Sequence, residues 1–466
     1  MAERKKGEFS SRFGFLMATV GSAVGLGNLW SYPYKMGKNG GAVFLFIYLI
    51  LTVLVGVVLM LAELGLGRRT GRGVVYAYRE IDKKFTFVGI FGWLAPLLIL
   101  GFYTMLGGFC IKYTVVNLGD FLGASWGLGA ADSSAYFAEF SADGIQTVVF
   151  TLIFILVTMI IVGAGITDGI EKFSVVAMPM LFGMLVIVII RSVTLPGAGA
   201  GLSFIFKPDL SAFRDFGWIS VLSAAGGQMF FSLSIGMGIN ITYGSYMKKE
   251  DDLVQSAWII PIADTLVAVL AALATMPAVF SAGLDPAQGP GMLFVTLQTV
   301  FKAMGRFGAL FGVIFYALVF IAAITSSIAL AETVVSSLID WQISHKKPHD
   351  RRKITILVGL AVAVMGVFIS IDGLGTQGLP QIFGQSCWLD SFDLVSEGIL
   401  LPLGSLILAL ILGWIRPHYI DEEFERNGET FALKNVWQFC IRYIVPPIMV
   451  FILLGQISAF FGLGWF

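Results

Sequence analysis

The chain of 466 residues carries little charge, because Asp, Glu, Lys and Arg make up only 13% of it, against about 25% in ordinary soluble domains. Hydrophobic residues reach 57%, and the mean hydropathy is +0.86. Long apolar runs recur from one end of the chain to the other, as in proteins whose helices cross a membrane. The composition therefore excludes an ordinary soluble domain and predicts an all-α polytopic membrane protein.

Cysteine and histidine are also scarce, with three residues of each. The cysteines lie in or beside apolar runs, so no disulfide framework is predicted. The histidines fall in polar segments, without metal-binding spacing and without a nucleophile beside them, so we do not expect an enzyme. The formal net charge is +0, which gives no reason to expect a nucleic-acid partner, and no obligatory protein partner is evident.

Apolar stretches of about 20 residues predict eleven transmembrane helices. Their approximate ranges are 12–35, 41–66, 87–117, 146–163, 170–191, 217–241, 254–282, 308–340, 354–371, 388–415 and 439–462. Lys and Arg gather in the segments 4–6, 68–84, 248–249 and 346–353, which the order of the spans places on one side. The positive-inside rule predicts a cytoplasmic N-terminus and a C-terminus outside.

The first span is interrupted by Gly21-Ser-Ala-Val-Gly-Leu-Gly-Asn28. Each glycine costs about 1 kcal/mol in a helix interior, so the helix is expected to break there. Within lipid, a break is tolerated only where the freed backbone groups are buried in protein or face a watery cavity. The segment is therefore a candidate binding site for a cation and an anionic group. Close helix packing through small residues is the alternative.

The sixth span holds a second polar, glycine-rich stretch, from Gln228 to Gly238. Two interrupted spans that each open a group of five helices are typical of a 5+5 inverted repeat. We expect a single transmembrane domain over residues 1–466, with repeat one at about 10–191 and repeat two at about 215–415. An extra helix at about 439–462 would lie outside the repeat.

Four acidic residues lie in or near predicted spans without Lys or Arg one helical turn away, namely Glu63, Asp264, Glu332 and Asp393. Intramembrane acids are costly and usually functional. A bound cation can neutralise Asp264, and the backbone donors of a broken helix can satisfy Glu63. Protonated acids in interhelical hydrogen bonds are the alternative. Residues 322–327 of the eighth span offer hydroxyls and carbonyls, although such hydroxyls usually bond their own helix.

Eight short motifs follow one another along the chain: Ser11-Arg-Phe-Gly-Phe15, the segment 21–28, Tyr32-Pro-Tyr34, Asn39-Gly-Gly41, Gly169-Ile-Glu-Lys-Phe173, Gln228-Met-Phe-Phe-Ser-Leu-Ser234, Thr325-Ser-Ser327 and Ile399-Leu-Leu-Pro-Leu403. In this order they resemble the bacterial neurotransmitter:sodium symporters, which have the leucine-transporter fold. The resemblance covers residues from about 8 to 456. It implies eleven helices with helices 1 and 6 broken, and secondary active transport of a small zwitterionic amino acid by alternating access.

The resemblance also implies two sodium sites, made of oxygen ligands that suit a hard cation. Site one would use Ala23, Asn28, Ser232, Asp264 and the substrate carboxylate. Site two would use the carbonyls of Gly21, Val24 and Ala322 with the hydroxyls of Thr325 and Ser326. The implied substrate pocket contains Ser22, Ala23, Gly27, Ile99, Tyr103, Phe231, Ser232, Ser234, Met237, Ser326 and Leu330.

Several positions narrow the expected substrate and ions. Gly25 stands where relatives that take amines without a carboxylate have Asp, so an amino acid is the better fit. Met237 and Leu330, with Phe231, predict an apolar and adaptable pocket wall. Asp264 stands where many members have Asn, and its built-in carboxylate would make chloride unnecessary.

The gates of the family are altered as well. Ser31 replaces the Arg that usually pairs with the residue at Asp393, so the outer gate cannot form in the usual way. On the inner side, Lys6 replaces an Arg and could still pair with Asp340, although Lys lacks the bidentate fork of Arg.

We therefore predict a multi-pass protein of the bacterial inner membrane, surrounded by lipid, that imports a neutral hydrophobic amino acid with sodium and without chloride. A transporter of a non-α amino acid or related small zwitterion is the alternative within the same mechanism. A channel and an amino-acid sensor on the same fold are two further interpretations. A steady conductance without substrate would indicate a channel, and binding without uphill flux would indicate a sensor.

Overall fold

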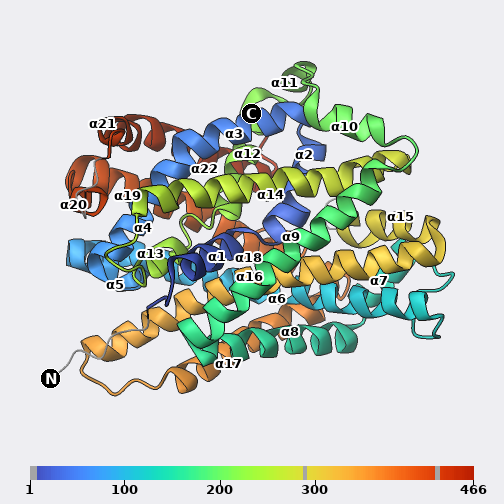
Figure 1. Cartoon of the computed structure of the whole chain (residues 1–466), viewed down its shortest axis with the longest axis horizontal. Coiled ribbons are helices and arrows are strands. Elements are labelled where there is room, and N and C mark those ends of the chain that lie inside the picture. Colours follow the sequence, from blue (N-terminus) through green and yellow to red (C-terminus); the bar gives the residue numbers. More distant parts are fainter. Residues whose placement is uncertain (1–7, 287–290, 426–430, 466) are drawn as a thin grey trace.

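The computed structural model describes residues 8–286, 291–425 and 431–465, and the regular secondary structure of these ranges is helical. The long helices run side by side along the longest axis of the molecule (Figure 1). Large apolar side chains face outward on several of them, for example Leu156 and Ile160, which are 60% and 62% exposed. Such exposure is typical of helices that face lipid.

The first five predicted spans correspond to helical segments in chain order. They are α1 (Arg12–Ala23), η1 (Gly27–Ser31) and α2 (Tyr32–Lys38); α3 (Ala42–Leu51), η2 (Thr52–Gly56) and α4 (Val57–Thr70); η3 (Lys83–Phe85) and α6 (Thr86–Leu122); α8 (Gly144–Ala164); and η4 (Ile166–Glu171) with α9 (Lys172–Val193).

The remaining spans are built in the same way. They are α12 (Trp218–Ser232) and α13 (Ile239–Gly244); α14 (Leu253–Ser281); α16 (Gly305–Ser344); α17 (Arg351–Asp372) and η6 (Gly373–Gly375); α18 (Trp388–Asp393), η7 (Leu394–Leu400), α19 (Leu401–Leu410) and η8 (Ile411–Ile415); and α21 (Lys434–Phe439), η10 (Cys440–Ile444) and α22 (Val445–Phe461).

Shorter helices connect the spans. They are α5 (Val74–Ile81), α7 (Ser133–Ala142), α10 (Ala198–Phe206), α11 (Ser211–Phe216), η5 (Met292–Thr296), α15 (Leu297–Ala303) and α20 (Asp421–Phe424). In Figure 1, α5 and α20 lie at the left end with the Lys- and Arg-rich loop between α16 and α17, whereas α7 and α15 lie at the right end. The Lys- and Arg-rich segments 68–84 and 346–353 therefore share one end of the molecule.

Nine continuous helical segments of the described residues are long and apolar enough to cross a membrane, and the bent first span makes a tenth. The sixth predicted span is split into α12 and α13, and neither piece is long enough to cross alone. Each of the eleven predicted ranges thus overlaps helical structure, and the all-α membrane fold is confirmed. The two five-helix repeats stay a prediction.

The longest helices, α6 and α16, pack against each other, and some of their residues surround the two breaks. Helix α1 packs on α16, and α13 packs on α4 and α16. In Figure 1, α1 lies near the middle of the molecule, and α13 lies beside it toward the left end, near α5. The residues at the two breaks are buried, so the breaks meet inside the helix bundle rather than at its surface.

Candidate substrate and ion site

Both glycine-rich segments break their helices. Helix α1 ends at Ala23 and η1 begins at Gly27, and the two pieces meet at an angle of 44°. Helix α12 ends at Ser232, and α13 begins at Ile239. The chain between them runs through residues whose side chains and backbone are buried, so every freed polar group needs a partner within the protein.

The N–H groups of the first break bond to side chains. In a continuous helix, Gly25 and Leu26 would donate to the carbonyls four residues earlier. Instead, the Gly25 N–H donates to Oδ1 of Asn28 (3.1 Å), and the Leu26 N–H donates to the hydroxyl of Tyr103 (3.1 Å). The carbonyl of Gly21 therefore loses its helical donor, which is the condition for such an oxygen to coordinate a cation.

The second break is held by Glu63 and Asn240. Positive φ angles at Ser234 (54°) and Gly236 (80°) turn the chain. The Gly236 N–H donates to Oε1 of Glu63 (2.8 Å), and the Asn240 amide donates to Oε2 (3.1 Å). The same amide donates to the carbonyls of Ser234 and the residue before it, each at 3.2 Å. Glu63 thus accepts one backbone N–H and one side-chain amide at the second break.

The two breaks contact each other through hydroxyl and amide groups. The Ser22 carbonyl accepts from the hydroxyls of Ser234 (3.3 Å) and Ser326 (3.0 Å). The Gln228 amide donates to the Gly27 carbonyl (2.8 Å). Helices from both halves of the chain therefore share one polar centre.

A cavity of about 20 Å³ lies at this centre. Ten of the eleven residues predicted to hold substrate line it: Ser22, Ala23, Gly27, Ile99, Tyr103, Phe231, Ser234, Met237, Ser326 and Leu330. Gly25 and Ile239 line it too, although the sequence did not place them in this set. The cavity has room for about one water, so a larger ligand requires side chains such as Phe231 or Met237 to move.

Gly25 has no room for a side chain. A Cβ at this position would collide with Oγ of Ser326 and lie 2.8 Å from the hydroxyl of Tyr103. The missing side chain is therefore what lets the hydroxyls of α6 and α16 approach the first break.

Asp264 on α14 is fully buried and forms a cluster with three of its neighbours. Its carboxylate accepts from the Asn28 amide (2.7 Å), the Ser232 hydroxyl (3.0 Å to each oxygen) and the Tyr48 hydroxyl (3.1 Å). The structure thus brings Asn28, Ser232 and Asp264 into contact, and Ala23 lines the cavity beside them. Ser232 faces this cluster rather than lining the cavity.

Gly21 and Thr325 of the predicted second ion site lie close together, where α1 packs on α16. A Cβ at Gly21 would lie 3.3 Å from Cβ of Thr325, and Val24 is fully buried. The Thr325 hydroxyl donates to the Ala322 carbonyl (2.9 Å), in the usual bonding of a hydroxyl to its own helix. Ser326 lies next to them and lines the cavity.

The side that is predicted to face outward contains an ion pair that the sequence analysis missed. The Ser31 hydroxyl donates to Gln228 (2.7 Å), and Asp393 is half-buried. Nζ of Lys35 lies 2.9 Å from Oε1 of Glu397. Lys35 follows Ser31 by four residues, and Glu397 follows Asp393 by four. The observed pair therefore lies one helical turn further along both helices than the family's usual gate pair at positions 31 and 393. That shared spacing is the signal that could have predicted it.

On the side that is predicted to be cytoplasmic, Asp340 accepts from the Gly73 N–H (2.6 Å) and lies 3.8 Å from the guanidinium of Arg72. It therefore connects α16 to the segment that precedes α5. Lys6, the predicted partner, lies outside the described residues.

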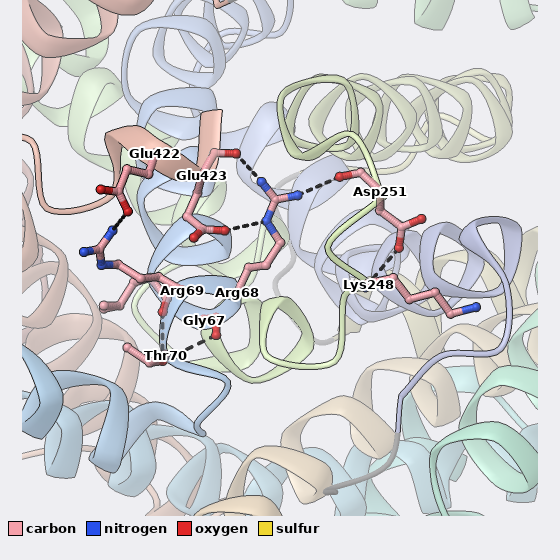
Figure 2. A network of polar contacts seen from close by, with 9 residues as sticks. Gly67, Arg68, Arg69, Thr70, Lys248, Asp251, Glu422 and Glu423 are labelled. Carbon is pink, nitrogen blue, oxygen red and sulfur yellow. Dashed lines mark hydrogen bonds and ion pairs between the residues drawn. The ribbon is translucent and has the colours of Figure 1, made fainter. Parts of the chain in front are cut away.

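A second contact on the same side joins three parts of the chain (Figure 2). Nε of Arg68 lies 2.9 Å from Oε2 of Glu423, and the guanidinium also donates to the carbonyls of Glu423 and Asp251. The two charged side chains are 2% and 0% exposed. This contact, which we call the Arg68 network, ties α4 to α20 and to the segment between α13 and α14. The sequence analysis did not single out its residues.

Glu332 has a basic partner after all. Arg351, at the start of α17, forms an ion pair with it, and the Tyr246 hydroxyl donates to it at 2.5 Å. Neither group is one turn away on the same helix, so the spacing along the chain could not show the pairing.

Two broken membrane helices that face each other around a buried polar cavity are typical of secondary transporters. The family model described as the Sodium:neurotransmitter symporter family matches residues 6–128 and 138–465. The chain belongs to this family, and the resemblance found in its motifs is confirmed. It is a sodium-dependent multi-pass membrane transporter, and its family is one of transporters rather than enzymes.

Individual relatives agree with the family. A Bacillus subtilis protein described as a sodium-dependent transporter is 34% identical over 98% of this chain and 99% of its own length. The rat sodium- and chloride-dependent GABA transporter 2 is 25% identical over 95% of this chain and 78% of its own. The crystal structure of MhsT in complex with L-phenylalanine is similar, with a TM-score of 0.86 and 34% identity over 97% of this chain and 100% of MhsT.

Proposed function

We propose that this transporter imports a neutral amino acid with an apolar side chain, coupled to sodium and independent of chloride. The observation that carries the proposal is the cavity between the two breaks. None of its lining residues is Asp, Glu, Lys or Arg, and the buried carboxylate of Asp264 lies next to it. A neutral substrate avoids leaving an unpaired side-chain charge in this site.

The lining supports recognition of both parts of an amino acid. The hydroxyls of Tyr103 and Ser326 meet the first break, and we assign the Tyr103 hydroxyl to the substrate carboxylate. The apolar lining of Ile99, Phe231 and Leu330 would receive the side chain. Met237 can repack around groups of different shape, and the similar protein MhsT was crystallised with L-phenylalanine.

Two sodium ions are proposed to travel with the substrate. At site one, a sodium ion would take the place of hydrogen bonds that Asn28 and Ser232 donate to Asp264, so the ion neutralises a buried carboxylate. At site two, the ion would use the released carbonyl of Gly21 and turn the Thr325 hydroxyl into a ligand.

The coupling is energetically sufficient. Each sodium ion moving inward releases roughly 2.3 kcal/mol per 100 mV and about 1.4 kcal/mol per tenfold gradient. Two ions release about 7 kcal/mol, enough for a substrate gradient on the order of 10⁵ with tight coupling. In this proposal the pieces on either side of the breaks change angle, and the cavity opens to each side in turn.

Purified protein in liposomes tests the proposal. We expect leucine, phenylalanine or tryptophan to accumulate only with an inward sodium gradient, and not when choline replaces sodium. Uptake that persists in choline would contradict sodium coupling. Stronger competition by GABA, lysine or aspartate than by leucine and tryptophan would contradict the substrate class.

Replacing chloride with gluconate tests the ion requirement separately. Uptake should be equal in both anions, because Asp264 supplies the negative charge beside site one. Asp264→Asn should lower the apparent sodium affinity, while Asp215→Asn at the surface should leave it unchanged. Wild-type uptake that collapses in gluconate would show that Asp264 does not have this role.

A further inference from the structure

Helices α8 and α17 form a groove on the outside of the bundle, away from the substrate cavity. The helices run antiparallel, since a Cβ at Gly163 would lie 3.8 Å from Thr355 and a Cβ at Gly359 would lie 3.1 Å from Met159. The groove has a volume of about 580 Å³. Its lining is Leu152, Ile155, Leu156, Met159, Ile160, Gly163, Ala164, Arg352, Thr355, Ile356, Gly359 and Leu360.

The groove has the length and surface of a site for an acyl chain. From Leu152 to Ala164 it follows twelve residue-to-residue steps of helix, which rise about 18 Å. One leaflet of the hydrocarbon core is about 15 Å thick, half of the roughly 30 Å of a bilayer. Its walls are exposed apolar side chains, with Ile356 and Leu360 each 62% exposed. Gly163 leaves the floor open, because its nearest neighbour is 3.8 Å from an added Cβ.

One end of the groove carries a positive charge. Arg352 lines it there, in the first turn of α17. Its basic neighbours are engaged: Arg351 pairs with Glu332, and Lys353 lies 3.9 Å from Asp350. Asp350 caps the helix by accepting from the N–H groups of Arg352 and Lys353. Among the described residues, no acidic side chain forms an ion pair with the guanidinium of Arg352.

We propose that this groove binds a phospholipid with an anionic headgroup, whose acyl chain lies along α8 and α17 and whose phosphate contacts Arg352. Basic pockets between membrane helices favour anionic headgroups. The segment between α16 and α17 adds Lys346 and Lys347 at the same end. A second copy of the chain would also cover the apolar walls, but an apolar groove with positive charge at one end matches the amphiphilic form of a lipid.

Native mass spectrometry of the full-length protein tests this, with phosphatidylglycerol and phosphatidylcholine of identical acyl chains as probes. We expect the wild type to retain phosphatidylglycerol preferentially. Arg352→Ala should reduce that preference about fivefold, the effect of one basic residue near the membrane surface. Lys353→Ala is the matched control, because Lys353 is adjacent and basic but does not line the groove, and it should behave like the wild type.

A second variant tests the acyl-chain part. Gly163→Leu fills the groove without a clash at Cβ and should reduce retention of both lipids, with helical content and sodium-dependent uptake unchanged. Equal retention of the two lipids by the wild type would overturn the proposal, as would an equal effect of Lys353→Ala. A Gly163→Leu variant that turns a dimer into a monomer while keeping its lipid would show that a second copy occupies the groove.

Discussion

At the scale of single residues, Gly25 shows how an absent side chain can shape a binding site. Two hydroxyls, from Ser326 and Tyr103, approach the first break because position 25 has no Cβ. The same break has its N–H groups bonded to Asn28 and Tyr103. The packing around the first break and the hydrogen bonds of its N–H groups thus depend on Gly25, which also lines the cavity.

Gly25→Ala should weaken sodium-dependent amino-acid binding roughly 5- to 150-fold, because overpacking a tight site costs about 1–3 kcal/mol. Binding of a radiolabelled amino acid to the purified protein measures this. Gly183→Ala, in helix α9, is the control, because no heavy atom lies within 4 Å of a Cβ added there. Equal affinities of Gly25→Ala and the wild type would show that the hydroxyls move aside without cost.

At the scale of elements, the broken helices depend on neighbours that complete their hydrogen bonding. The turn between α12 and α13 leaves backbone groups that no regular helix satisfies. Glu63 on α4 accepts from that turn, so α4 and the break form one structural unit. A carboxylate that would be costly alone in a membrane is here stabilised by donors.

Glu63→Gln should lower the free energy of unfolding by about 1–3 kcal/mol, because hydrogen bonds to a charged acceptor are lost and the new NH₂ group faces other donors. Thermal unfolding of the purified protein measures the change. Glu139→Gln, on the exposed face of α7, should have no measurable effect. Unchanged stability of Glu63→Gln would indicate that Glu63 is protonated in the folded protein.

Helices α2 and η7 are joined by the Lys35–Glu397 pair, whose side chains are 21% and 10% exposed. In a double-mutant cycle with Lys35→Met and Glu397→Gln, we expect a coupling energy of about 1 kcal/mol in thermal stability. Lys38→Met removes an exposed lysine of the same helix and should show no coupling to Glu397→Gln. Additive effects of the first pair would show that the contact does not hold the two helices together.

At the scale of the whole molecule, the Arg68 network connects parts of the chain that are far apart in sequence. Arg68 and Glu423 are 355 positions apart, and their contact is almost fully buried. Figure 2 shows that the neighbouring pair of Arg69 and Glu422 lies beside it, and that pair is 30% and 77% exposed. Movement of α4 relative to α20 would have to disrupt the buried contact.

Arg68→Met should destabilise the protein by about 3–5 kcal/mol, because it removes the positive charge beside a buried carboxylate. The double variant Arg68→Met/Glu423→Leu should recover most of this loss, since it removes both charges. Arg69→Met should cost less than about 1 kcal/mol, as expected of an exposed pair. Thermal unfolding of the four proteins measures these differences, and equal effects of Arg68→Met and Arg69→Met would contradict the role of burial.

The membrane fold, the positions of the spans and the two breaks could all be predicted from the sequence. These features depend on local properties: hydropathy over about 20 residues and the cost of glycine within a helix. The order of the motifs also indicated the family, and ten of the proposed pocket residues surround one cavity.

The pairing of charged groups, in contrast, became visible only in the folded bundle. Arg68 contacts Glu423 from 355 positions away, Arg351 neutralises Glu332 from the next helix, and Ser232 turns toward Asp264 instead of the cavity. The choice of partner depends on how helices pack and which faces they turn inward, and spacing along one helix carries no information about that. The sequence of each span by itself therefore determines where the backbone is helical and where it breaks, whereas the tertiary structure of the bundle determines which charged groups pair.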